Sequence, residues 1–215
     1  MLTRESSPQF TYPIRLPTIP SFSHGNAEDI GDDLPILNLC RDAGFSVFAY
    51  DYQGYGTSEG RPSERAMYAD VTAAYEYLTE QLKTPPQQII SMGRSLGCAA
   101  AIDLAARRPV AALVIESPFL SAFRVLTRVQ LLPWDRFRNA DKIRQIHVPV
   151  LVIHGRADRV VPFWQGQSLF TLANEPKHAL WLDSAGHNDA MIIAPKKYLE
   201  TLRIFANSLA NSARQ

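Results

Sequence analysis

The sequence has little of what several protein classes require. It carries two cysteines, Cys40 and Cys98, in 215 residues, which are too few for a disulfide framework. Both lie in predicted helices, so we expect buried free thiols. Basic and acidic side chains nearly balance, at a net charge of +1, which gives no reason to expect nucleic acid or an anionic membrane as a partner.

Long apolar runs and ligand-binding signatures are absent as well. No apolar run approaches the roughly 20 residues of a membrane span, and residues 1–8 lack the apolar core of a signal peptide. We therefore expect a cytoplasmic protein without an integral membrane segment. No Cys/His spacing suggests zinc, and the loop at residues 51–60 lacks the third spaced glycine of a nucleotide fingerprint. We expect no metal and no cofactor.

What the sequence does have is an alternation of short apolar segments and segments of helical periodicity. Its 46% hydrophobic and 20% charged residues are typical of a globular protein, and its length fits one α/β domain over residues 1–215. Residues 1–20 hold four prolines and predict an irregular lead-in. Strands are predicted at residues 18–23, 45–50, 89–92, 110–115, 148–153 and 179–182.

Helices are predicted between these strands. They run from Ile30 to Gly44, from Ser63 to Pro85, from Ser95 to Pro109, and over about 162–174 and 195–210. About residues 117–147 form a short, mostly helical, lid-like excursion. The pattern predicts an α/β fold, with a mostly parallel sheet of about six strands and helices on both faces.

The segment Gly93-Arg94-Ser95-Leu96-Gly97 stands between a buried strand and an alanine-rich helix. The five-residue pattern alone is weak, but this setting is typical of a nucleophile elbow. The strand must turn into the helix at once, so any side chain at Gly93 or Gly97 would collide with a neighbour. Ser95 is then held at the carboxyl edge of the sheet. The Leu96 amide lies at the helix N-terminus, where the dipole favours negative charge.

A serine hydroxyl needs a general base, and the base should lie at the same sheet edge. Of the five histidines, His147 and His178 precede predicted strands and so lie at the wrong edge. His24 and His154 lie at the correct edge, but each opens a His-Gly turn where we expect a structural role. His187 follows the last strand in a loop of small residues and is our candidate base. The alternative is an ordinary surface histidine.

Asp158 directly follows the strand at 148–153 and is the candidate acid. The order Ser95, Asp158, His187 is that of α/β-hydrolases. The alternative is that Asp158 is a turn residue that caps the helix starting at Pro162. The aspartates beside the histidine are too close in sequence to reach the far side of its ring.

The loop His24-Gly25-Asn26-Ala27 follows the first predicted strand. In this fold the second oxyanion donor comes from such a loop, so we expect the Asn26 amide to act with the Leu96 amide. A tight turn at His24-Gly25 is the alternative, and the two roles are compatible.

Four motifs together resemble the serine α/β-hydrolases, over roughly residues 22–206. They are Ser23-His24-Gly25-Asn26-Ala27-Glu28-Asp29, Asp51-Tyr52-Gln53-Gly54-Tyr55-Gly56, the elbow segment, and His154-Gly155-x-x-Asp158. The sequence is most similar to a small, lid-poor subgroup that includes eukaryotic palmitoyl-protein depalmitoylases. The resemblance implies a triad of Ser95, Asp158 and His187, with the Asn26 and Leu96 amides as oxyanion hole.

The sequence departs from that family in two respects. The family has two or more strands before its His-Gly-Asn loop, and only some 23 residues precede the loop here, so we expect those N-terminal strands to be missing. The depalmitoylases also carry an N-terminal cysteine cluster for membrane attachment, and this sequence has none. The second departure argues against a membrane-bound protein substrate.

For several other side chains we expect structural roles. We expect Asp51 to brace a loop, and we expect no direct role for Glu116, with a place facing the site as the alternative. We expect Trp134 and Phe137 to pack on the core, with an acyl pocket as the alternative. A solvated basic face is predicted for the arginines at 124, 128, 136 and 138.

The residues together predict a serine hydrolase that cleaves carboxylic esters or thioesters of a small-molecule or acylated substrate through an acyl-enzyme. A serine peptidase or amidase on the same fold is the first alternative. A non-catalytic or truncated member of the fold is the second.

Overall fold

The computed structural model describes residues 19–122 and 136–212. Across these residues the sheet has six strands in the order β2-β1-β3-β4-β5-β6, and each neighbouring pair is parallel. The strands are β1 Ile19–Ser23, β2 Phe48–Tyr50, β3 Ile89–Arg94, β4 Ala112–Glu116, β5 Val150–Gly155 and β6 Lys177–Leu182. The predicted α/β-hydrolase fold is confirmed.

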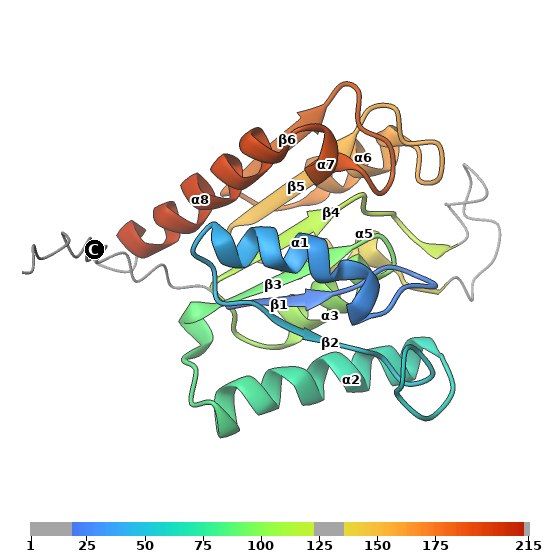
Figure 1. Ribbon diagram of the computed structural model, residues 1–215. Helices are drawn as coiled ribbons and strands as arrows, with labels where there is room; N and C mark the ends of the chain where they lie inside the picture. The colour runs from blue at the N-terminus through green and yellow to red at the C-terminus, as the bar shows by residue number, and fades with distance from the viewer. Residues whose placement is uncertain (1–18, 123–135, 213–215) are drawn as a thin grey trace, which may run out of the picture.

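The helices occupy the connections between these strands (Figure 1). They are α1 Ile30–Asp42, α2 Glu64–Glu76, α3 Gly97–Arg107, α5 Asn139–Lys142, α6 Phe163–Leu172, α7 Ala190–Ile193 and α8 Pro195–Ser212. A π-helical turn at Tyr77–Gln81 extends α2, and short 3-10 turns lie at Pro86–Gln88 and Ile143–Gln145.

Two layers of helices cover the two faces of the sheet (Figure 1). Side chains alternate along each strand, so Val114 of β4 packs in the core beneath α1 and α8, whereas Leu113 and Ile115 pack with α3 and α6. Strands buried on both faces are continuously apolar, which is why the sequence revealed them. Cys40 and Cys98 are buried free thiols, as predicted.

Local signals set where the helices begin. The Ser63 hydroxyl accepts the Ala66 amide at 3.0 Å and caps α2, as the sequence predicted. Asp29 caps α1 in the same way, by accepting from Gly31 and Asp32. Because all strands are parallel, the loops that follow β1, β3, β5 and β6 meet at one edge of the sheet (Figure 1).

The observed strand boundaries differ from the predicted ones by up to three residues, most clearly at the starts of β2 and β6. β2 begins at Phe48 and not at residue 45, because Phe45 packs into the core before the strand starts. β6 begins at Lys177, so His178 lies inside the strand and not before it. Its place near the amino end still puts it at the edge opposite Ser95.

A buried charge cluster joins α1 to the end of β3. Arg94 Nη2 lies 2.7 Å from Asp33 Oδ1 on α1 and 2.7 Å from Glu28 Oε2, in the loop before α1. The side chains of Arg94 and Asp33 are 5% and 1% exposed, so each needs the other as a partner. Burial raises the pKa of Asp33 from 3.8 to about 6, although the Arg94 charge opposes the rise.

This shift predicts how stability changes with pH. Between pH 4 and 6 folded Asp33 holds a proton that the unfolded chain releases, so the free energy of unfolding falls as pH rises through this window. On going from pH 7.5 to pH 5, the wild type should gain about 1 kcal/mol more than Asp33→Asn. Urea unfolding followed by circular dichroism measures this difference, and identical pH dependence of the two proteins would contradict it.

Candidate active site

The turn between β3 and α3 places Ser95 in a strained conformation. Its φ is +51°, in the left-handed region that residues other than glycine seldom adopt. Two backbone hydrogen bonds hold the turn: the Ser95 amide donates to the Glu116 carbonyl at 2.9 Å, and the Cys98 amide donates to the Ser95 carbonyl at 3.1 Å. The neighbouring strand and the helix together therefore fix the backbone that carries the hydroxyl.

Close backbone approach explains the two glycines of the motif. A Cβ on Gly93 would overlap the carbonyl of Gly97, and a Cβ on Gly97 would overlap the carbonyl of Ser23 at the end of β1. Only glycine lets α3 start directly against two strands. The same approach brings the loop after β1 next to Ser95.

Three predicted residues from three loops form one chain of contacts. His187 Nε2 lies 2.8 Å from Ser95 Oγ, and His187 Nδ1 lies 2.8 Å from Asp158 Oδ2. The contacts are satisfied when Ser95 donates to Nε2 and Nδ1–H donates to the carboxylate. The structure thus brings together the serine, histidine and aspartate that the sequence had singled out.

Asp158 is fully buried and uses both carboxylate oxygens. Oδ1 accepts the amides of Val160 and Val161 at 2.9 and 2.8 Å, while Oδ2 faces His187 and lies 3.2 Å from His154 Nε2. Burial alone would raise the pKa of Asp158, but the hydrogen bonds from His154 and His187 outweigh it and hold the pKa below its ordinary value. Asp158 therefore stays ionised, and it stabilises its turn as well as facing the imidazole.

The loop that carries His187 is fixed from two sides. The Ser117 hydroxyl donates to the His187 carbonyl at 3.2 Å. Asp189 accepts the Gly186 amide at 2.6 Å, so this neighbouring carboxylate closes the loop. The His187 side chain is 10% exposed, which leaves it accessible from the carboxyl edge of the sheet.

Leu96 directly follows Ser95 in the chain, and Asn26 and Leu96 line a common cavity. Within residues 19–122 and 136–212, neither backbone amide has a hydrogen-bond acceptor. The Tyr55 hydroxyl donates to Asn26 Oδ1 at 2.7 Å and holds that side chain. Two unused amides beside a serine hydroxyl are what an oxyanion site requires.

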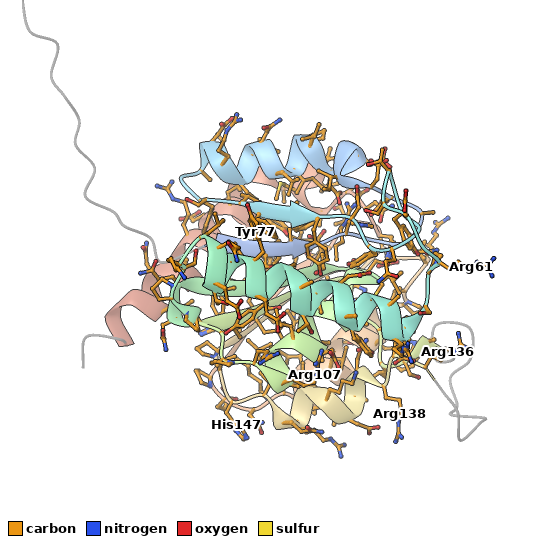
Figure 2. All side chains as sticks on the ribbon, turned by 90° about the horizontal axis from the view of Figure 1, so that it is seen from below. Arg61, Tyr77, Arg107, Arg136, Arg138 and His147 are labelled. Carbon is orange, nitrogen blue, oxygen red and sulfur yellow. The ribbon has the colours of Figure 1, made fainter. Side chains whose placement is uncertain are left out.

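The cavity has a volume of about 340 Å³ and a mixed lining. It is lined by Asn26, Tyr52, Gln53, Tyr55, Pro62, Ser63, Glu64, Met67, Leu96, Arg136 and Phe137. Arg136 lies at the same end of the molecule as Arg61, far from His147 (Figure 2). Asn26, Tyr52 and Leu96 follow β1, β2 and β3, so the cavity lies at the carboxyl edge of the sheet, where apolar and polar side chains line it together.

The excursion after β4 is described only in part. Phe137 packs edge-on against Phe119 and Tyr68, as predicted, and it also lines the cavity, while the acyl-pocket alternative stays a prediction. Arg136 and Arg138 are exposed, in agreement with the predicted basic face. Three further residues of these predictions lie outside the described residues: Arg124, Arg128 and Trp134.

Two other carboxylates have structural partners. Asp51 accepts the Ile30 amide at 2.9 Å and braces the start of α1, as predicted. Glu116 is buried beneath the sheet edge and accepts from the Tyr198 hydroxyl at 2.5 Å. Burial raises the pKa of Glu116. This carboxylate is buried and has a core side chain, Tyr198, as its partner.

The two His-Gly histidines are buried and have structural partners, as expected. His24 Nδ1 lies 2.9 Å from the Gly25 carbonyl, and His154 Nε2 lies 3.0 Å from the Val161 carbonyl. Sequence reasoning missed Arg94, Glu28 and Tyr55. A charged residue that ends an apolar strand was the available signal for Arg94, because a buried guanidinium needs a partner.

The described ranges, 19–122 and 136–212, lack two features. They contain no group of three or more histidine, cysteine or acidic side chains placed to hold a metal ion. No helix within them is long and apolar enough to cross a membrane.

A family model described as serine aminopeptidase, S33, matches residues 21–134, just over half of the chain. An α/β hydrolase domain-containing protein of Caenorhabditis elegans, aho-3, is 41% identical over 196 residues, which cover 90% of this chain and 58% of the relative. Human α/β hydrolase domain-containing protein 17B is 40% identical over 189 residues, which cover 86% of this chain and 65% of the relative. The chain thus spans about three fifths of the nematode protein's length and slightly less than two thirds of the human protein's.

Solved structures agree on the fold. The structure of an esterase from Pyrococcus furiosus superposes with a TM-score of 0.76 at 19% identity, and the match covers 89% of this chain and 82% of the esterase. An esterase domain from Rhodothermus marinus gives a TM-score of 0.66 at 22% identity, over 90% of this chain and 88% of that domain. Sequence, fold and relatives agree, and the chain belongs to the α/β-hydrolase superfamily.

Proposed function

We propose that the protein is a serine hydrolase that cleaves carboxylic esters or thioesters through an acyl-enzyme on Ser95. One observation carries the proposal: the two 2.8 Å contacts that link Ser95 Oγ, His187 and Asp158 in a single line. A serine activated in this way, beside two unused amides, is suited to attack an acyl carbonyl.

The first half of the reaction forms the acyl-enzyme. His187 Nε2 takes the proton from Ser95 Oγ as the oxygen attacks the carbonyl carbon. Asp158, ionised and bonded to Nδ1, holds the ring and stabilises the imidazolium. The carbonyl oxygen becomes an oxyanion that accepts from the Asn26 and Leu96 amides, and one such donor is worth about 10²–10³ in rate. His187 then protonates the leaving alcohol or thiol.

The second half releases the acid. Water takes the place of the leaving group, His187 removes its proton, and the resulting hydroxide attacks the acyl carbonyl of the ester on Ser95. The collapse of the second tetrahedral intermediate returns the proton from His187 to Ser95 Oγ. No other co-reactant is needed.

The cavity beside Asn26 and Leu96 supports an acylated or small-molecule substrate. Tyr52, Met67 and Phe137 offer it apolar contact, while Glu64 and Arg136 supply polar groups. The sequence resemblance to depalmitoylases favours thioesters among the candidate substrates.

A serine peptidase is the second candidate, because the matching family model is described as a serine aminopeptidase. Both reactions use the same acyl-enzyme and differ in the leaving group. An amine leaves less readily than an alcohol or a thiol, so it demands more from His187 as general acid.

The proposed triad predicts the effect of three substitutions on p-nitrophenyl butyrate hydrolysis. Ser95→Ala and His187→Ala should each lower kcat by at least about 10⁴-fold, and Asp158→Asn by about 10⁴-fold, because the three groups act as a unit. Asp183→Asn is the matched control, since its side chain is 89% exposed, and it should keep full activity. Activity retained by a folded Ser95→Ala variant would exclude this mechanism.

Leaving-group preference is tested with an ester, a thioester and an anilide of the same butyryl group. We expect kcat/KM for the ester and the thioester to exceed that for the anilide by more than about 100-fold, a difference of roughly 3 kcal/mol in transition-state stabilisation. Equal turnover of the anilide would favour the peptidase.

A further inference from the structure

One carboxylate oxygen joins the two halves of the candidate site. Glu28 Oε2 accepts the Gly25 amide at 2.9 Å and also lies 2.7 Å from Arg94 Nη2. Gly25 directly precedes Asn26, and Arg94 directly precedes Ser95. The contact therefore couples the loop after β1 to the nucleophile turn, each at the residue next to a proposed participant in the reaction.

The loop after β1 is held in a conformation that needs support. Ala27 has a φ of +59°, a left-handed conformation that a residue other than glycine keeps only when its surroundings impose it. A Cβ on Gly25 would overlap Glu28 Oε2, so the carboxylate packs directly against the loop backbone. The Glu28 side chain is only 19% exposed, and the charge that neutralises it belongs to Arg94.

We propose that Glu28 and Arg94 are positioning residues that hold the Asn26 amide at the distance from Ser95 that the oxyanion requires. This inference rests on the proposed function. Without the Glu28 carboxylate, the Gly25 amide loses its acceptor and the loop is free to shift. A shift of even a fraction of an ångström weakens a hydrogen bond that forms only with the oxyanion.

Asp33 offers a matched comparison within the same cluster. Its Oδ1 lies at the same 2.7 Å from the same Arg94 nitrogen, but it comes from α1 and, within residues 19–122 and 136–212, it has no hydrogen bond to the loop of Gly25. Removal of either carboxylate leaves Arg94 with one of its two ion pairs. Only the removal of Glu28 also takes away the acceptor of the Gly25 amide in the loop after β1.

The experiment compares Glu28→Met, Glu28→Gln and Asp33→Leu on p-nitrophenyl butyrate. Glu28→Met should lower kcat on the order of 10–100-fold with little change in KM, because the Asn26 contact strengthens in the transition state. Glu28→Gln should recover most of the loss, since its amide oxygen can still accept from Gly25 and Arg94. Asp33→Leu should keep kcat within about threefold. Melting curves are recorded for each variant.

A second measurement distinguishes a displaced Asn26 amide from a general loss of rigidity in the protein. A trifluoromethyl ketone captures the serine as an oxyanionic adduct, so its affinity reports the oxyanion site. For Glu28→Met the affinity should fall by the same factor as kcat/KM. Arg94→Met is not used as the main test, because it leaves two carboxylates without their cation and endangers folding.

Three results would overturn the inference. They are an unchanged kcat in Glu28→Met, a loss confined to KM, and an equal loss of kcat in Asp33→Leu. Failure of the proposed function gives a different result, because the wild type itself would then neither hydrolyse the ester nor bind the ketone.

Discussion

The approach of two backbones at Gly97 is the constraint on which the rest of the site depends. The start of α3 lies so close to the end of β1 that no side chain fits between them. That approach sets Leu96 beside Asn26 and forces the chain through the left-handed turn at Ser95. The hydroxyl is therefore oriented by the backbone and its neighbouring strands, and its place does not depend on a flexible side-chain contact.

Buried charges also hold the nucleophile turn, at the end of β3, against the loop after β1. Arg94 ends an apolar strand, and its guanidinium is buried only because Glu28 and Asp33 face it. Burial raises the pKa of Asp33 although the Arg94 charge opposes the rise, so the desolvation of this carboxylate is not fully offset by its partner. Apolar residues in place of all three charged side chains would pack at lower cost, but they would not connect the nucleophile turn to the loop of Gly25. The cost in stability is consistent with the positioning role that we propose for the pair.

Residues with local signatures could be predicted from the sequence. The strand–turn–helix setting indicated Ser95, and the rule that parallel strands end at one edge selected Asp158 and His187 among many acids and histidines. The described geometry places these three in contact, while their catalytic roles stay predictions. The fold followed from the alternation of buried strands and amphipathic helices.

Long-range pairings could not be predicted in this way. In the sequence, Glu28 and Asp33 resemble exposed acids at the start of a helix. Their partner, Arg94, lies more than 60 residues away, and no residue near them in the sequence indicates this pairing. The orientation of Glu116 toward Tyr198 depends on how α8 crosses the sheet. The short β2 reflects tertiary packing of Phe45, which its apolar neighbours do not reveal.

Covalent labelling tests the central claim most directly. The full chain is treated with a fluorophosphonate, which reacts with an activated serine, and the modified peptide is identified by mass spectrometry. The account predicts a single stoichiometric adduct on Ser95, abolished in Ser95→Ala and strongly slowed in His187→Ala. A folded wild-type protein that stays unlabelled, or that carries the adduct on another residue, would contradict it.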